Sequence, residues 1–389
     1  MSMDASLTYN LSPLPSLLVV GALLAFGPAM FVWLRDGGRT PAQRVQALRV
    51  LTLFLTFDLL LFGAFTRLTD SGLGCPDWPG CYGHTSPVGA SPQIIDAQNR
   101  MPEGPVTHAK AWIEMLHRYL ATAVGALILL LTTLSWRDWR RNREKLRAMP
   151  WLPTLTLVWV CVQGAFGALT VTMRLFPAIV TLHLLGAIAL LVLLCVPVVR
   201  GEESRRAWPP LSAGARRLLA WSSVLLLLQI ALGAWVSSNY AVLACSDFPT
   251  CQGSWWPDMN FSQGFEVWRG LGVNAAGVPI DFSALTAIHY VHRLTAYGVV
   301  PLLMLLAWQL NRTKAWRVQS RVLAALSILQ LATGVSNVVL GWPMLAALLH
   351  TGGAGALVLT LTWVATKAQW RADKSPAAGR GSVHPGVGP

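Results

Sequence analysis

The chain has 389 residues, of which 54% are hydrophobic and 12% charged, and its mean hydropathy is +0.50. This composition excludes a set of ordinary soluble domains and indicates a chain that lies largely in membrane lipid. The formal net charge of +13 would suit a nucleic acid if the basic residues formed one patch, but they are spread over every second connection between apolar segments. We therefore expect no nucleic-acid partner.

Apolar segments of about 20 residues suffice to cross a hydrocarbon core of about 30 Å, and the sequence contains nine of them. Their approximate limits are Leu14 to Leu34, Leu48 to Phe65, Ala111 to Trp136, Trp151 to Met173, Ala178 to Val199, Leu218 to Val236, Ala284 to Leu310, Val322 to Leu340 and Met344 to Ala365. We predict an all-α integral membrane protein. No basic stretch precedes the first segment, which argues against a cleaved signal peptide and leaves an interfacial helix as an alternative to a span.

The basic residues predict the orientation in the membrane. Five segments hold 23 of the 30 lysine and arginine residues: Arg35 to Arg49, "RDWRRNREKLR", Arg200 to Arg217, "NRTKAWRVQSR" and the tail from Lys367. The positive-inside rule places these segments in the cytoplasm and the N-terminus outside. The outer side then holds the long connections 69–110 and 237–283.

Each of these outer connections carries a pair of cysteines, in "CPDWPGC" from Cys75 to Cys81 and in "CSDFPTC" from Cys245 to Cys251. Disulfides persist on the oxidising outer side, so we predict one within each pair. A redox-active pair of free thiols and a metal site remain as alternatives, although a structural zinc usually needs four ligands. Cys161 and Cys195 lie inside spans, where we expect small buried apolar residues.

The cysteine motif belongs to a longer internal repeat. "EMLHRYLATAVG" matches "HYVHRLTAYGVV", and "QGAFGALTVTMRLFPAIVTLHLLGA" from Gln163 matches "QLATGVSNVVLGWPMLAALLHTGGA" from Gln330. The match places His117 on His292, Arg118 on Arg293 and His183 on His350. Because an even number of spans separates equivalent positions, we predict two four-helix transmembrane bundles related by a pseudo-twofold axis along the membrane normal.

The repeat predicts four parts of the chain. Residues 1–47 form an extra N-terminal transmembrane helix with its cytoplasmic connection, and residues 48–200 form the first four-helix half. Residues 201–366 form the second half, and residues 367–389 form a disordered cytoplasmic tail rich in proline and glycine.

The four matched histidines lie, by this topology, about 8 to 12 Å below the outer surface. Each half therefore offers two imidazoles on different helices, as needed to hold an iron porphyrin between them. A buried histidine that only links two helices is the alternative for any one position. Ionisable groups in lipid usually mark function, and the repetition of both residue and depth favours haem ligation at His117, His183, His292 and His350.

The two halves differ one helical turn before the first histidine. The first half has Glu114, on the same helix face as His117, and the second half has His289. A carboxylate beside a haem can relay protons, so Glu114 is the candidate catalytic residue. A salt bridge to Arg118 or contact with outer water is the alternative.

Other polar residues surround these positions. Arg118 and Arg293 could contact haem propionates, but a snorkelling side chain or a bond to a neighbouring carbonyl is an equal alternative. For Gln163 and Gln330 we favour hydrogen bonds between helices. His289 could be a third imidazole at the second site, but a contact with the outer loop or a propionate is the preferred interpretation.

These residues give the chain a resemblance to a known family, the heme A synthases. The matching elements are "TRLTDSGLGCPDWPGC", "EMLHR", "TLHLLGA", "CSDFPTC", "VHRLTA" and "LLHTGGA", and they fall between about Leu48 and Ala365. The resemblance implies oxidation of the C8 methyl of haem O to a formyl group by successive hydroxylations, which gives haem A for cytochrome c oxidase. The family commonly has eight spans, so the segment from Leu14 to Leu34 is a departure.

The resemblance also implies roles for the two halves. His292 and His350 would hold a haem b cofactor, His117 and His183 would bind the substrate haem O, and Glu114 would be the essential carboxylate. It implies the cytoplasmic (inner) membrane of a bacterium and an electron donor that the sequence does not identify. Haem O synthase and further copies of the chain are candidate partners. A membrane cytochrome b with two haems for electron transfer and a haem carrier are the alternatives, and Glu114 favours the enzyme.

Overall fold

The structure is a computed structural model that describes residues 9–34, 40–142, 149–201 and 208–372. Within these ranges nine helices are long and apolar enough to cross a membrane, which confirms the predicted all-α membrane protein. They are α2 (Leu14–Leu34), α3 (Pro41–Leu68), α5 (His108–Arg141), α6 (Trp151–Thr172), α7 (Pro177–Gly201), α8 (Ala213–Ser238), α10 (Phe282–Asn311), α11 (Arg317–Val339) and α12 (Met344–Ala372).

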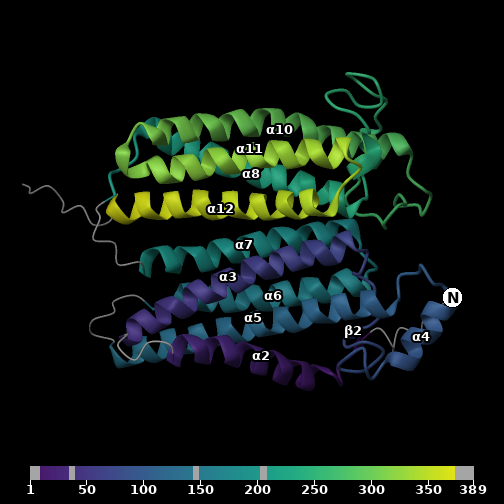
Figure 1. Ribbon diagram of the computed structural model, residues 1–389, viewed down its shortest axis with the longest axis horizontal. Helices are drawn as coiled ribbons and strands as arrows, with labels where there is room; N and C mark the ends of the chain where they lie inside the picture. Colours follow the sequence, from purple (N-terminus) through teal and green to yellow (C-terminus); the bar gives the residue numbers. More distant parts are fainter. Residues whose placement is uncertain (1–8, 35–39, 143–148, 202–207, 373–389) are drawn as a thin grey trace, which may run out of the picture.

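The long helices form two groups that follow the halves of the sequence repeat (Figure 1). α3, α5, α6 and α7 pack together as the first group, and α8, α10, α11 and α12 pack together as the second. The groups meet where α7 contacts α8 and α12, and where α3 contacts α12. The extra helix α2 packs on α5 and α3, at the outside of the first group.

Both cysteine-bearing connections lie at the same end of the helices (Figure 1). The first contains α4 (Ser91–Arg100) and β2 (Trp78–Pro79); the second contains the short helices η1 (Val242–Ala244) and α9 (Phe261–Gly264). This arrangement agrees with the predicted outer side. A further short helix, η2 (Lys314–Trp316), lies between α10 and α11 at the opposite end.

Capping residues and internal hydrogen bonds explain where these helices begin and why they tolerate polar side chains. Thr40 forms a capping box with Gln43 at the start of α3, and the side chains of Thr107 and Ser212 cap α5 and α8. Within α3, the buried hydroxyl of Thr52 donates to the carbonyl of Leu48 at 2.8 Å. Such bonds satisfy polar groups where no water is present.

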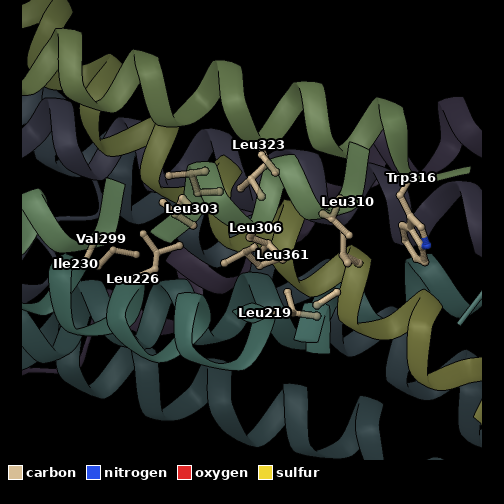
Figure 2. Packing of buried hydrophobic residues seen from close by; sticks show 14 of the residues in the cluster. Leu219, Leu226, Ile230, Val299, Leu303, Leu306, Leu310, Trp316, Leu323 and Leu361 are labelled. Carbon is tan, nitrogen blue, oxygen red and sulfur yellow. The ribbon is translucent and has the colours of Figure 1, made fainter. Parts of the chain in front are cut away.

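The core of the second group is built from leucine and isoleucine side chains that interdigitate between α8, α10, α11 and α12 (Figure 2). Leu306, Leu310 and Leu323 are almost fully buried. In lipid the hydrophobic effect does not drive helices together, so close packing of this kind is what holds them in register. The same cluster includes Leu60 of α3 and Leu191 of α7, so it joins the two groups.

The helix α2 covers the first cysteine loop. Leu17 is buried against the two cysteines Cys75 and Cys81, and β1 (Tyr9–Asn10) pairs in parallel with β2. A Cβ on Gly21 would lie 2.4 Å from the side chain of Thr122 on α5, so glycine is needed for this close approach. The extra segment is therefore a ninth helix packed on the bundle.

Two details differ from the expectations. Cys195 is buried on α7, as predicted, but Cys161 is exposed; the prediction for Cys161 was wrong because α6 lies at the edge of its group and turns one face outward. The last helix continues to Ala372, past the boundary expected at residue 366. Residues 373–389 of the predicted tail, including the basic residue Lys374, lie outside the described residues.

Candidate functional site

The four candidate haem ligands lie on four different helices, near the end that carries the cysteine loops. His117 lies nine residues after the start of α5 and His292 ten residues after the start of α10. His183 and His350 each lie six residues after the start of their helices, α7 and α12. At about 1.5 Å per residue they lie about 9 to 15 Å from the helix starts, so the four depths are similar.

A glycine on the preceding transmembrane helix lies against each of these imidazoles. A Cβ added to the glycine would lie 2.9 to 3.4 Å from the Cε1 atom of the histidine. The four pairs are Gly63 with His117, Gly167 with His183, Gly233 with His292 and Gly334 with His350. A Cβ at Gly233 would push the ring of His292, one at Gly63 or Gly167 would press on the facing ring, and one at Gly334 would make ordinary van der Waals contact. The first three glycines therefore limit where the imidazoles lie.

We expect Gly233→Ala to disturb the second site. Its methyl carbon would lie 2.9 Å from Cε1 of His292, closer than van der Waals contact between carbon atoms at about 3.5 Å, and the ring must move. The absorption spectrum of the low-spin haem should change, and the haem content of the purified protein should fall severalfold. Gly298→Ala, on α10, is the matched control because its Cβ would meet nothing within 4 Å. Equal spectra for both variants would contradict the role of Gly233.

The second-half histidines fit an iron porphyrin held between two imidazoles. The ring centroids of His292 and His350 are 6.5 Å apart, about the separation expected when one metal ion bonds a nitrogen of each ring at about 2 Å. Both rings are only half-buried. The Nδ1 atom of His350 lies 2.9 Å from the hydroxyl of Thr333, and that of His292 lies 3.1 Å from the amide of Gln229.

The first-half histidines lie in a different environment. His117 and His183 are half-buried and close enough to interact electrostatically. The ring of His117 stacks on Phe62 of α3, with centroids 6.2 Å apart and planes 8° from parallel. Among the described residues, the Nδ1 atoms of both rings are buried without a hydrogen-bond partner. Two imidazoles are a donor set that iron porphyrins take, and the ligation of a haem by this pair stays a prediction.

The two glutamines hold the helices that carry the ligands. The amide of Gln163 on α6 donates to the backbone carbonyl of His183, and that of Gln330 on α11 donates to the carbonyl of His350 at 3.1 Å. Both bonds run between neighbouring helices, which confirms the expectation for these two residues. They position the backbone of a ligand histidine in each half.

The cysteine loops are closed by disulfides, as predicted. The S–S distances are 2.09 Å for Cys75–Cys81 and 2.01 Å for Cys245–Cys251. In the part of the chain that the structure describes, no group of three or more His, Cys, Asp or Glu side chains could hold a metal ion. Both cysteine pairs are therefore disulfides, as predicted.

The aspartate inside each motif organises its loop. Asp77 accepts hydrogen bonds from the backbone amides of Tyr82 and Gly83 at 2.6 and 2.8 Å. Asp247 accepts the corresponding bonds from Gln252 and Gly253 at 2.6 and 3.1 Å. The hydroxyl of Thr250 and these amides hold the pKa of Asp247 below its ordinary value, so the carboxylate stays ionised and accepts all of these bonds at neutral pH.

Arg118 and Arg293 connect the ligand-bearing helices to these loops. Arg118 donates to the carbonyls of Asp77, Pro79 and Gly80. Arg293 makes the equivalent bonds to the carbonyls of three residues in the second loop: Asp247, Pro249 and Thr250. The alternative of carbonyl contacts is thus present in both halves, while contact with haem propionates stays a prediction.

The carboxylate of Glu114 lies between α5 and the first disulfide loop. Its exposed fraction is 4%. One oxygen pairs with Arg118 at 2.5 Å, and the other accepts the backbone N–H of Cys75 at 2.7 Å. The expected salt bridge is therefore present.

His289 occupies the matching place in the second half. Its Nδ1 atom lies 3.0 Å from the carbonyl oxygen of Ala241, and its Nε2 atom lies 3.4 Å from Arg293. The preferred interpretation of His289 as a contact to the outer loop is confirmed. Only the first half has a buried carboxylate at this position.

Removing the first disulfide should destabilise the loop above His117. The loop between Cys75 and Cys81 is short, so the double variant Cys75→Ser/Cys81→Ser should lose about 2 kcal/mol of stability. The midpoint of thermal unfolding in detergent should fall by a few degrees, and Cys161→Ser is the control because Cys161 is a free thiol. An unchanged midpoint would show that Asp77 and Arg118 suffice to hold the loop.

Sequence reasoning missed the glycines and the partners of the ring nitrogens. A signal was present, because Gly63 and Gly233 each precede the first cysteine of their loop by twelve residues. Gly167 and Gly334 each follow a matched glutamine by four. Glycine is common in membrane helices, however, so its role could be assigned only once the facing helix was known.

Comparison with known proteins agrees with this architecture. Residues 46–362 match the family model of COX15-CtaA, described as cytochrome oxidase assembly protein. A protein named heme A synthase from Shewanella oneidensis is 38% identical over 323 residues, covering 83% of this chain and 96% of the relative.

More distant relatives carry the same name. A heme A synthase from Halalkalibacterium halodurans is 27% identical, covering 79% of this chain and 91% of its own length. One from Rhizobium etli is 28% identical, covering 78% of this chain and 83% of its own length. With its matching family model and its paired histidine halves, the chain belongs to the COX15-CtaA family of cytochrome oxidase assembly proteins.

Proposed function

We propose that this protein is a heme A synthase, a multi-pass bacterial membrane enzyme that oxidises the C8 methyl of haem O to the formyl group of haem A. The observation that carries the proposal is a duplicated pair of histidine sites in which one half alone adds a buried carboxylate, Glu114. The relatives named heme A synthase support the same reaction.

The two halves would bind different haems. We assign haem b to His292 and His350, whose rings are spaced for one iron and have polar neighbours at Nδ1. We assign the substrate haem O to His117 and His183. Haem b, when bound, would supply the redox chemistry, with dioxygen as the oxidant and electrons from the unidentified donor. Two hydroxylations of the methyl carbon, followed by loss of water from the resulting diol, would give the formyl group.

The residues of the chain would orient the substrate and control protons. Gly63 and Gly167 place the two imidazoles, and the carbonyl of His183 is held by Gln163. Glu114 would accept or release a proton at the carboxylate oxygen that pairs with Arg118. The disulfide loop closes the outer end of this half and limits the access of water.

The decisive experiment is expression in a host that makes haem O but no haem A, followed by extraction and mass analysis of the haems. Haem A should appear with the wild-type chain and be absent with an empty vector. If the purified protein carries haem and receives a reductant but only haem O is recovered, the enzyme assignment fails. A bis-haem cytochrome b would then be the better description if the bound haem changes redox state, and a haem carrier if haem O is only bound and released.

A further inference from the structure

The hydrogen bonding of the ligand histidines differs between the halves in a consistent way. Thr333, which lies next to Gly334 on α11, places its hydroxyl 2.9 Å from Nδ1 of His350. Gln229, one turn before Gly233 on α8, places its amide 3.1 Å from Nδ1 of His292. In the second half, the Nδ1 atom of each ligand histidine therefore has a polar neighbour.

The matching positions of the first half are apolar. Phe166 stands directly before Gly167, where the second half has Thr333 before Gly334. Leu59 stands four residues before Gly63, where the second half has Gln229 before Gly233. Neither side chain can form a hydrogen bond, and the Nδ1 atoms of His117 and His183 are buried without a partner among the described residues.

The contact at His350 suits a ring that carries its proton on Nδ1. The hydroxyl of Thr333 lies 2.7 Å from the carbonyl of Leu329, and when it donates to that carbonyl its lone pairs accept the proton on Nδ1 of His350. That tautomer leaves Nε2 of the ring free to bind a metal. A metal-ligating histidine usually has such a partner, which fixes the ring and raises the basicity of the ligand.

The amide of Gln229 is itself held in place. Its oxygen accepts the hydroxyl of Thr295 at 2.5 Å, and its nitrogen donates to the backbone carbonyl of His292 at 3.0 Å. With its oxygen held by Thr295, the amide presents its nitrogen to Nδ1, so Gln229 holds His292 through the backbone carbonyl and through contact with the ring, and not as an acceptor for a proton on Nδ1. In the second half, Thr333 and Gln229 therefore each hold one of the two ligand histidines.

We propose that Thr333 and Gln229 are positioning residues that make the second half a permanent haem site, and that Phe166 and Leu59 leave the first half free to exchange its haem. The inference rests on the proposed function, because an enzyme whose substrate and product are both haems must bind one haem tightly and release the other. The shared glycines lie against the four rings, and the unshared polar residues set how firmly the ligands are held.

The test is a set of variants of the full-length protein, purified in detergent with its bound haem. Thr333→Val keeps the shape of the side chain and removes the hydroxyl, and Gln229→Leu introduces the residue of the first half. Each should release haem b to apomyoglobin about 10-fold faster or more. The reduction potential should rise, because a less basic imidazole stabilises ferric iron less.

Two controls separate the ring contact from general damage. Thr360→Val, on α12, removes a hydroxyl that bonds only within its own helix, to the carbonyl of Ala356 at 2.8 Å, and should leave both quantities unchanged. Thr333→Ser restores the hydroxyl and should restore slow release. If Thr333→Val and Gln229→Leu release haem at the rate of Thr360→Val with the same potential, the inference is overturned.

The reciprocal change tests the first half. Phe166→Thr with Leu59→Gln should slow the exchange of haem from this half, so product haem A stays on the protein and turnover falls. Unchanged exchange would count against the inference. Failure of the proposed function gives a different result, because the wild-type protein would then make no haem A whatever its rate of haem release.

Discussion

The His350→Ala protein is expected to lose its resident haem b. Loss of a hydrogen-bond partner to a ligand typically lowers metal affinity about 10- to 100-fold, so loss of the ligand should lower the bound haem at least about tenfold. His292→Ala should do the same, because each ring supplies one side of the pair whose centroids are 6.5 Å apart. The measurement is haem per protein after purification, together with the low-spin absorption bands.

The first-half variants should separate the two sites. His117→Ala and His183→Ala should keep the haem b spectrum and lose the formation of haem A. His108→Ala is a control on the same helix as His117, because His108 is exposed at the start of α5. If His350→Ala retains a normal low-spin spectrum while His117→Ala loses it, the assignment of the two halves is reversed.

Glu114→Gln is expected to lower the formation of haem A by about 100-fold or more, the usual size of a general acid–base contribution. In the wild type the N–H of Cys75 lies 2.7 Å from a carboxylate oxygen of Glu114. The amide oxygen of glutamine can still accept this hydrogen bond, so the loop should remain attached. It can no longer carry the proton or the charge that faces Arg118. Haem b content should stay close to wild type while the product disappears, and the thermal midpoint should fall by a few degrees because the amide NH2 replaces the oxygen that pairs with the buried Arg118.

The matched control is Glu103→Gln, an exposed carboxylate in the same outer connection, which should leave activity unchanged. Glu114→Asp keeps the acid but shortens the side chain, so activity should be partly retained. If Glu114→Gln forms haem A at the wild-type rate, Glu114 serves only to attach α5 to the disulfide loop through Arg118 and Cys75.

Several features were predictable because they follow from chain-wide patterns. Lipid cannot satisfy exposed backbone groups, so nine long apolar segments had to be helices. The duplicated spacing brought His117 and His183 to matching depths with His292 and His350, because rise along a helix depends only on residue number. The spacing of the cysteines, with the predicted outer side, was enough to expect both disulfides.

Other features could not be read from spacing. Arg118 was equally compatible with a propionate or a carbonyl, and its choice of the carbonyls of the first loop depends on how that loop folds back over α5. The exposure of Cys161 depends on the position of α6 at the edge of its group. Which side of a helix faces lipid is set by its neighbours, and an almost uniformly apolar helix carries little signal of it.

The sequence by itself determined the number of spans, the repeat, the four imidazoles and the single carboxylate that distinguishes the halves. Only the tertiary structure decided what surrounds each imidazole: the glycine against its Cε1, and Thr333 or Gln229 beside its Nδ1 in one half alone. The reason is physical, because a ring is surrounded by residues from other helices, and their approach depends on how the helices pack and not on their separation along the chain.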